Sequence, residues 1–186
     1  MNKLGIIILN WNGHEDTIEC IESIQNNGEI QFTIFLLDNG SEQRSVKYIK
    51  TWLENFCTLS FKIMNEDEFY QCNEFSNFTL YFIEGKKNLG FAKGNNLIWE
   101  NIKNIFDYTL LLNNDTVITK NAITNMLNYM DSNLNTGVIS CDIRLYSQPK
   151  KLWNAGGYFT WYGDRKYYKQ RKIDKFKKNN IEVIRT

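Results

Sequence analysis

Short apolar runs alternate with amphipathic helical patterns along much of the chain, and this alternation is the feature that most constrains the fold. Residues 4–9 form an unbroken apolar run that is too short for a membrane span and is typical of a strand buried on both faces. The segment 15–26 follows, with Ile18, Ile21 and Ile24 on one helical face. Strands and helices that alternate with short links predict βαβ units, and therefore an α/β fold with a mainly parallel sheet flanked by helices.

The same pattern recurs downstream. Further strands are predicted at residues 32–37, 80–83, 108–112 and 137–143. Further helices are predicted at residues 42–56, 95–104 and 122–130. The length of 186 residues fits one domain of ordinary size, so we expect a single domain over residues 1–186.

Two segments do not follow this alternation. Residues 57–79 are long for a link between a helix and a strand and predict an insertion, in which the alternating stretch 59–63 is typical of a hairpin strand. The tail from residue 166 onward is strongly basic as far as residue 178, and residues 181–184 are a candidate for one more strand.

The balance of charges and the cysteine pattern limit the partners. Lys and Arg number 22 against 21 Asp and Glu, and the net charge of +1 argues against a nucleic-acid-binding protein. The four cysteines lack Cys-x-x-Cys spacing and His14 is the single histidine, so a zinc site is not expected. This cysteine usage, without a signal-peptide pattern, predicts a cytoplasmic protein; peripheral contact with a membrane stays open.

Polar clusters follow three of the predicted strands. They occupy residues 10–12, 38–41 and 113–116. Ligands of open α/β sheets bind beyond the carboxyl ends of the strands, so these clusters are expected to meet at one edge. Their coincidence is stronger evidence for a ligand site than any one cluster.

The cluster after the predicted strand 108–112 brings a carboxylate to that edge. Asn113, Asn114 and Asp115 follow three leucines. One carboxylate together with the phosphates of a ligand is enough to hold a divalent cation such as Mg²⁺. The alternative is that the three residues only form a turn that ends the strand, and both interpretations stay open at this point.

A glycine-containing segment, residues 88–96, lies between a predicted strand and a predicted helix. Gly90 and Gly94 allow close approach of the backbone, and the amides at a helix start attract anions. Lys93 adds a positive charge. An ordinary glycine-containing loop is the alternative.

Two further candidates follow the first two strands. Asp38 is placed to accept a hydrogen bond from a nucleotide base or ribose, although Asn39 and Gly40 are also a common turn signal. Trp11 is placed to line a base pocket, although tryptophan more often packs in a core. His14 is interpreted as a helix-start residue.

Together, residues 7–12, 38–41, 88–96 and 111–116 resemble the family-2 glycosyltransferases, in the same order and at the same positions in the sheet. The segment 88–96 is most similar to the rhamnosyltransferase-type branch. The resemblance implies the GT-A fold, a base-binding Asp38, and a variant Asp-x-Asp metal motif in which Asp115 holds Mg²⁺ or Mn²⁺. The residues it implies for nucleotide-sugar binding are Leu9, Asn10, Trp11, Asp38, Asn88, Gly90, Lys93, Gly94, Asn95 and Asn114.

By the same resemblance, the chain is expected to transfer a sugar, with inversion, from a nucleoside diphosphate to the hydroxyl of a glycan or lipid-linked acceptor. The donor is expected to be dTDP- or UDP-linked, and the setting to be bacterial cell-wall or polysaccharide assembly. Residues 153–157 are similar to a glycine-containing segment of such enzymes. The motif with the general base normally lies further on, so we expect it beyond Thr186, and expect the chain as given to be truncated and to bind donor with little transfer.

Two other functions stay open. A binding module that recognises a nucleotide sugar without turnover would also need these residues, and turnover with donor and acceptor distinguishes it. A nucleotidyltransferase is disfavoured because residues 10–13 lack the glycine-rich, basic signature that usually follows the first strand. A nicotinamide-dependent enzyme is disfavoured because no Gly-x-Gly-x-x-Gly follows that strand.

Overall fold

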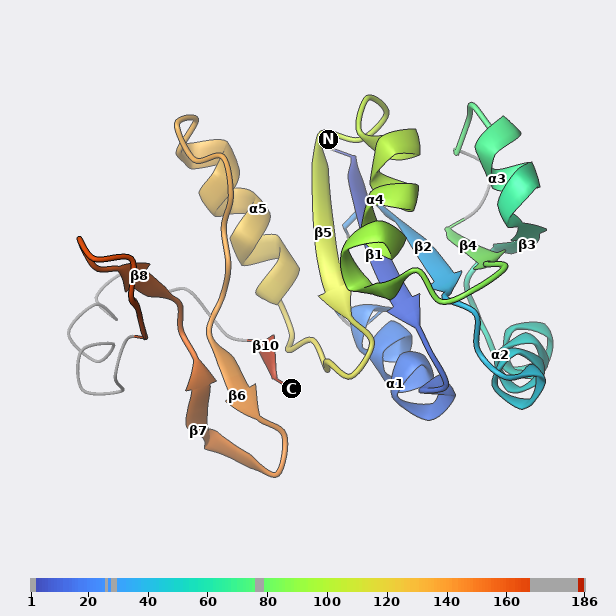
Figure 1. The fold of residues 1–186 in the computed structure, drawn as a ribbon, viewed down its shortest axis with the longest axis horizontal. Coiled ribbons are helices and arrows are strands. Elements are labelled where there is room, and N and C mark those ends of the chain that lie inside the picture. Colours follow the sequence, from blue (N-terminus) through green and yellow to red (C-terminus); the bar gives the residue numbers. More distant parts are fainter. Residues whose placement is uncertain (1–2, 26, 28–29, 76–78, 168–183, 186) are drawn as a thin grey trace. The chain divides into compact units, whose positions relative to one another are not determined.

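The structure is a computed structural model, and its elements are shown in Figure 1. It describes residues 3–25, 27, 30–75, 79–167 and 184–185. Contacts divide the chain into two compact units. The first comprises Met1–Ile18 and Gln31–Asp115, and the second comprises Glu19–Ile30 and Thr116–Thr186. The expected single domain over residues 1–186 and the expected insertion at 57–79 stay predictions.

The first unit is built on a five-stranded sheet in the order β3-β4-β2-β1-β5, in which every pair is parallel. The strands are β1 (Leu4–Asn10), β2 (Phe32–Asp38), β3 (Phe61–Asn65), β4 (Leu80–Glu84) and β5 (Tyr108–Asn113). Their pairing places Asn10 level with Asp38, and Asp38 level with Glu84. The carboxyl ends of these strands therefore lie along one edge, and the predicted parallel sheet is confirmed.

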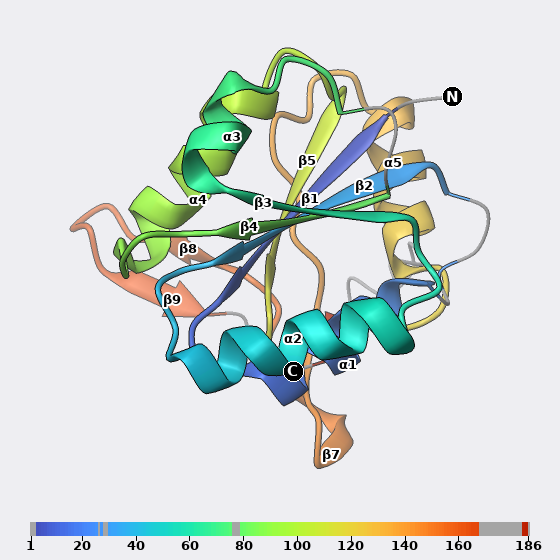
Figure 2. The same cartoon turned by 90° about the vertical axis from the view of Figure 1, so that its right-hand side faces the viewer.

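Helices cover both faces of this sheet. They are α1 (His14–Gln25), α2 (Gln43–Asn55), α3 (Glu66–Gln71) and α4 (Gly90–Ile102). Helix α2 lies against one face, and α3 and α4 lie against the other (Figure 2). Helix α1 begins in the first unit and ends in the second.

An aromatic cluster fills the core between the sheet and helices α3 and α4. Phe35 is fully buried on β2 and stacks on Tyr81 of β4, with ring centroids 5.6 Å apart. The edges of Phe69, Phe75 and Phe106 surround the same ring at 5.0–6.1 Å. Such edge and offset contacts add to the hydrophobic gain of burying the rings, so this cluster anchors the face of the sheet that carries α4.

The second unit contains α5 (Ala122–Ser132) and two small sheets. Strands β6 (Ile143–Leu145) and β7 (Gln148–Asn154) pair antiparallel, and β10 (Ile184–Arg185) pairs parallel to β6. Strands β8 (Gly157–Phe159) and β9 (Arg165–Tyr167) form a hairpin.

The end of α1 belongs to this unit because its polar side chains bond to the segment before α5. Ser23 Oγ accepts a hydrogen bond from Ile118 N at 2.9 Å, and Asn27 Oδ1 accepts one from Ile123 N at 3.4 Å. Tyr146 Oη donates to Glu19 Oε1 at 2.7 Å.

No helix within the described ranges is long and apolar enough to cross a membrane.

Three expectations from the sequence were wrong. The stretch 59–63 is not part of a hairpin, because β3 pairs parallel with β4 at the edge of the main sheet. Helix α4 begins at Gly90 instead of residue 95, so Gly94 and Asn95 lie inside it. Residues 137–142 do not form a strand. The side chain of Val138 is 89% exposed, so the apolar residue that suggested a buried strand is not buried. Of the predicted strand 181–184, residues 181–183 lie outside the described residues.

Replacing the central aromatic ring should destabilise the first unit strongly. Phe35→Ala removes a fully buried ring that contacts four others, and we expect a loss of about 3–5 kcal/mol in the free energy of unfolding. Phe56→Ala is the control, because Phe56 is 72% exposed and should change stability by less than about 0.5 kcal/mol. Urea denaturation measures both; equal losses would contradict the assigned core.

Candidate functional site

The order of the strands in the main sheet reverses at β1, and the carboxyl ends of β1 and its neighbours form the carboxyl edge of the sheet. From β1 the chain continues to β2 on one side, whereas β5 lies on the other side of β1. In open α/β sheets, ligands bind beyond the carboxyl ends of adjacent strands whose connections diverge in this way. The polar residues that follow β1, β2, β4 and β5 lie at this edge.

The side chain of Asn10, the last residue of β1, is fully buried and joins the loops after β1 and β2. Its Nδ2 donates to Asp38 Oδ1 at 2.8 Å and to Ser41 Oγ at 3.1 Å. Its Oδ1 accepts from Gly13 N at 3.2 Å and from Thr17 Oγ1 at 3.0 Å. Both polar ends of this amide are therefore satisfied within the protein, as a buried amide requires.

Asp38 ends β2 and shapes the turn that follows it. The residue is 2% exposed; its Oδ1 accepts from Asn10, and its Oδ2 accepts from Ser41 N at 3.0 Å. Asn12, which has a left-handed φ of 59°, donates its N–H to Ser41 Oγ at 2.9 Å and accepts from Glu42 N at 2.8 Å. The loops after β1 and β2 therefore form one hydrogen-bonded structure.

Asn39 and Gly40 attach the loop after β4 to this structure. Asn39 Oδ1 accepts from Leu89 N at 2.9 Å, and Asn39 Nδ2 donates to Asn88 Oδ1 at 3.2 Å. Gly40 has a φ of +76°, and a Cβ there would lie 2.5 Å from Asn88 N. Only glycine fits both the left-handed backbone and the close approach, so Gly40 holds the two loops together.

Helix α4 presents its amino end at the same edge. Asn88 Oδ1 accepts from Gly90 N at 2.7 Å, and Gly90 itself is exposed with a φ of +73°. The first N–H groups of a helix have no partner within the helix and carry a partial positive charge, which suits an anion. Lys93 is exposed on the first turn.

Other residues of the predicted glycine segment serve packing inside the helix. A Cβ at Gly94 would lie 2.9 Å from Leu9 Cδ1, so this glycine lets α4 approach β1 closely. Asn95 is buried and its Nδ2 donates to Phe91 O at 2.9 Å. Leu9 and Gly94 therefore set the close contact between β1 and α4, and Asn95 bonds within the helix. The contact of these three residues with a ligand stays a prediction.

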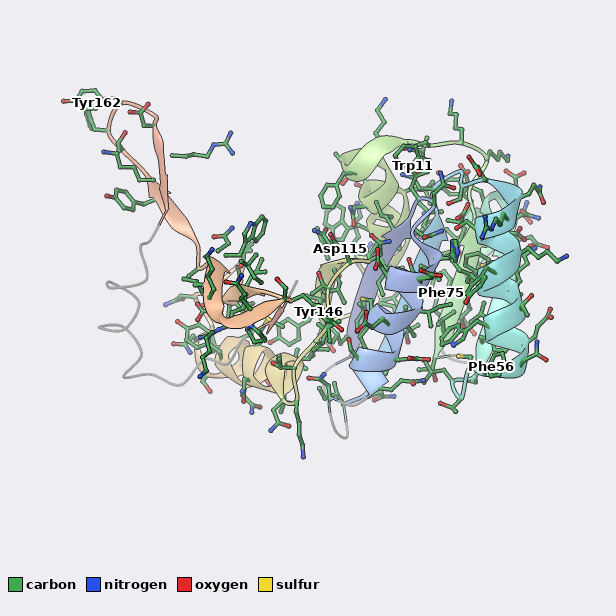
Figure 3. All side chains as sticks on the ribbon, turned by 90° about the horizontal axis from the view of Figure 1, so that it is seen from below. Trp11, Phe56, Phe75, Asp115, Tyr146 and Tyr162 are labelled. Carbon is green, nitrogen blue, oxygen red and sulfur yellow. The ribbon has the colours of Figure 1, made fainter. Side chains whose placement is uncertain are left out.

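Asp115 is exposed just beyond β5, and Trp11, which is 60% exposed, lies beyond β1, the adjacent strand (Figure 3). Asn114 turns inward; its Nδ2 donates to Thr17 Oγ1 at 3.0 Å and lies 3.4 Å from Gly13 O. Among the residues that the structure describes, no group of three or more acidic, histidine or cysteine side chains could hold a metal. A single carboxylate at this edge fits a divalent ion that takes most of its ligands from a bound diphosphate and water.

The structure thus brings most of the predicted site residues to one edge. Five of them take part in the hydrogen bonds that join the loops after β1, β2, β4 and β5: Asn10, Asp38, Asn88, Gly90 and Asn114. Three others are exposed beside these loops: Trp11, Lys93 and Asp115. Thr17 was missed by the sequence analysis, since a threonine within a helix carries no local signal of its distant partners.

Comparison with known proteins decides which fold family this arrangement belongs to. A model of glycosyl transferase family 2 matches residues 5–185. The chain belongs to glycosyl transferase family 2. Its parallel sheet with helices on both faces is the GT-A fold of that family.

Two solved structures illustrate the likeness in fold. S. aureus TarS 1–349 in complex with UDP-GlcNAc is 14% identical, with a TM-score of 0.51; the match covers 77% of this chain and 34% of that one. The mannosyltransferase PcManGT from Pyrobaculum calidifontis in complex with GDP-Man and Mn²⁺ is 10% identical, with a TM-score of 0.51; the match covers 77% of this chain and 35% of that one. The match thus spans about a third of these two chains. Sequence comparison with curated proteins finds no match.

Gly40 offers a direct test of the loop contact. Gly40→Ala combines an unfavourable left-handed φ with a clash against the backbone of Lys87 and Asn88, so we expect a loss of about 3 kcal/mol or more in stability. Gly90→Ala has a similar φ of +73° but nothing within 4 Å of its Cβ, and should lose only about 1–2 kcal/mol. Equal losses in urea denaturation would show that the loops are not in contact.

Proposed function

We propose that this chain binds a nucleoside diphosphate sugar at the carboxyl edge of its main sheet and transfers the sugar to an acceptor hydroxyl with inversion. The observation that carries the proposal is the convergence of three features at one edge: the turn after β2, the amino end of α4 and the single carboxylate after β5. Membership of glycosyl transferase family 2 supports it. So do the ligands in the two similar structures, UDP-GlcNAc in one and GDP-Man with Mn²⁺ in the other.

Each of the three features is proposed to bind a different part of the nucleotide sugar. The turn at Asp38 and the exposed indole of Trp11 are proposed to hold the nucleoside. An aromatic face suits a base, and each carboxylate oxygen of Asp38 keeps a second lone pair, besides the one that bonds to Asn10 or Ser41, that can accept a base N–H. The amides at the start of α4, with Lys93, are proposed to face the diphosphate. Asp115 is proposed to hold Mg²⁺ or Mn²⁺ between the protein and the diphosphate.

Charge balance supports a metal at this edge. Lys86, in the loop before α4, bonds to Asp67 at 2.6 and 2.8 Å, and this hydrogen bond raises the pKa of Lys86. Its charge is thus already paired, whereas Lys87 and Lys93 are exposed. A diphosphate is a dense anion, and a bound cation would neutralise the charge that grows on it as the sugar leaves.

Inversion enters the proposal from the resemblance of residues 7–12, 38–41, 88–96 and 111–116 to family-2 glycosyltransferases. In an inverting transfer, the acceptor hydroxyl attacks the anomeric carbon from the face opposite the leaving diphosphate. A dTDP- or UDP-linked donor, a glycan or lipid-linked acceptor, and a setting in bacterial polysaccharide assembly extend the proposal, and the similarity of residues 88–96 to rhamnosyltransferase-type enzymes supports the donor.

Removing the charge of Asp115 should abolish the metal dependence of ligand binding. Asp115→Asn keeps the size of the side chain, and because Asp115 is exposed the variant should fold normally. Calorimetric titration with UDP, with dTDP and with GDP, each with Mn²⁺ and with a chelator, measures the effect. Wild-type affinity should fall in chelator by roughly ten-fold or more, as expected for losing a charge-assisted contact of about 1.5–3 kcal/mol.

The variant should bind equally weakly under both conditions. Glu54→Gln is the control, since Glu54 is an exposed carboxylate of the same unit near the end of α2 and should leave the titration unchanged. Wild-type binding that is equally tight in chelator, or an Asp115→Asn variant that keeps its response to Mn²⁺, would assign the residues after β5 to a simple turn.

A further inference from the structure

We propose that Thr17 is a positioning residue that orients the side-chain amide of Asn114, so that its carbonyl oxygen and not its NH₂ group faces the ligand beside Asp115. The inference rests on the proposed function in that it assumes a diphosphate and a metal at this edge. It concerns a residue of α1 that is remote in sequence from the motif it would control.

The first step concerns the hydroxyl of Thr17. Thr17 is fully buried, and its Oγ1 lies 2.7 Å from Gly13 O, 3.0 Å from Asn10 Oδ1 and 3.0 Å from Asn114 Nδ2. Gly13 O and Asn10 Oδ1 can only accept, so the one proton of the hydroxyl points to them. A lone pair of Oγ1 is left for Asn114, which must therefore offer its NH₂ group.

The second step fixes the orientation of Asn10. The carboxylate of Asp38 is an acceptor, so the group of Asn10 that lies 2.8 Å from it is the NH₂ group. The N–H of Gly13, 3.2 Å from the other end of the Asn10 amide, is a donor and requires the carbonyl oxygen there. If the Asn10 amide were rotated by half a turn, Asp38 Oδ1 and the N–H of Gly13 would both lose their hydrogen bonds. Leaving such groups without a partner inside the protein costs more free energy than losing a hydrogen bond that water can replace.

The carboxylate of Asp38 thus fixes the orientation of the Asn10 amide. Asn10 in turn fixes the direction of the Thr17 hydroxyl, and that hydroxyl fixes which end of the Asn114 amide faces it. Nδ2 of Asn114 also lies 3.4 Å from Gly13 O, and a Cβ at Gly13 would come within 2.8 Å of Nδ2, so the amide packs directly on this glycine. Oδ1 then lies on the other side of the amide group, on the residue before Asp115. An amide oxygen is a suitable ligand for Mg²⁺ or Mn²⁺, or an acceptor for a sugar hydroxyl, whereas an NH₂ group would repel the cation.

A pair of substitutions separates the hydroxyl of Thr17 from its bulk. Thr17→Val keeps the shape and removes the hydroxyl, and Thr17→Ser keeps the hydroxyl and removes a methyl group. We expect Thr17→Val to weaken the affinity for UDP, dTDP or GDP in Mn²⁺ by about three- to ten-fold, the range for one neutral hydrogen bond. The affinity in chelator should stay within about two-fold of wild type. Thr17→Ser should restore the response to Mn²⁺.

Thr33→Val is the matched control. Thr33 is a buried threonine near the amino end of β2, and the proposed site lies at the carboxyl ends of the strands. The same substitution at Thr33 should therefore leave both affinities unchanged. A structural role alone would lower the affinities in Mn²⁺ and in chelator by the same factor for both Thr17 variants. That result, or full Mn²⁺ dependence in Thr17→Val, would overturn the proposal.

A measurement without ligand keeps the inference separate from the proposed function. Hydrogen exchange of the Asn114 side-chain NH₂, assigned by NMR from its loss in Asn114→Asp, should be slow in the wild type and in Thr17→Ser and fast in Thr17→Val. Failure of the wild type to bind any of UDP, dTDP and GDP would contradict the proposed function. Fast exchange in the wild type would overturn the orientation of Asn114 by itself.

Discussion

The parallel register of β1 with its two neighbours is the constraint on which the carboxyl edge depends. Asn10 is level with Asp38 across one side of β1, and Leu9 is level with Asn113 across the other. The strands are held in this register by buried apolar side chains on both faces, and a shift by one residue would exchange the faces of every side chain. The edge is therefore positioned by packing energy from the whole sheet and not by its own few polar contacts.

Polar groups at this edge fall into two classes with different physical roles. Asn10, Thr17 and Asp38 are almost completely buried and bond to one another or to the backbone, and a buried polar group left unpaired costs about 1–3 kcal/mol. Trp11 and Asp115 are exposed. The first class holds the loops in one arrangement, so that the second class stands on a rigid base when a ligand arrives, which lowers the ordering cost of binding.

Local pattern was enough to predict the parallel sheet, because strands such as residues 4–9 are buried on both faces and contain few polar residues. It failed where partners are distant. The edge position of β3 depends on its pairing with β4, and the contact of Thr17 with Asn114 depends on β1 and β5 being neighbours; neither is written in the adjacent residues. The start of α4 was predicted too late because glycine disfavours helix interiors, a preference that the packing of Gly94 on Leu9 outweighs.

The two glycines of α4 show how one short motif meets two separate demands. Gly94 is buried, and its missing side chain allows the helix to touch Leu9 on β1. Gly90 is exposed, has nothing within 4 Å of its would-be Cβ, and is required for its left-handed backbone. The first glycine brings the helix close to the central strand, and the second turns the chain so that the helix begins at the carboxyl edge. A helix start carries its partial positive charge only within the first turn, so both conditions must hold for that charge to reach an anion at this edge.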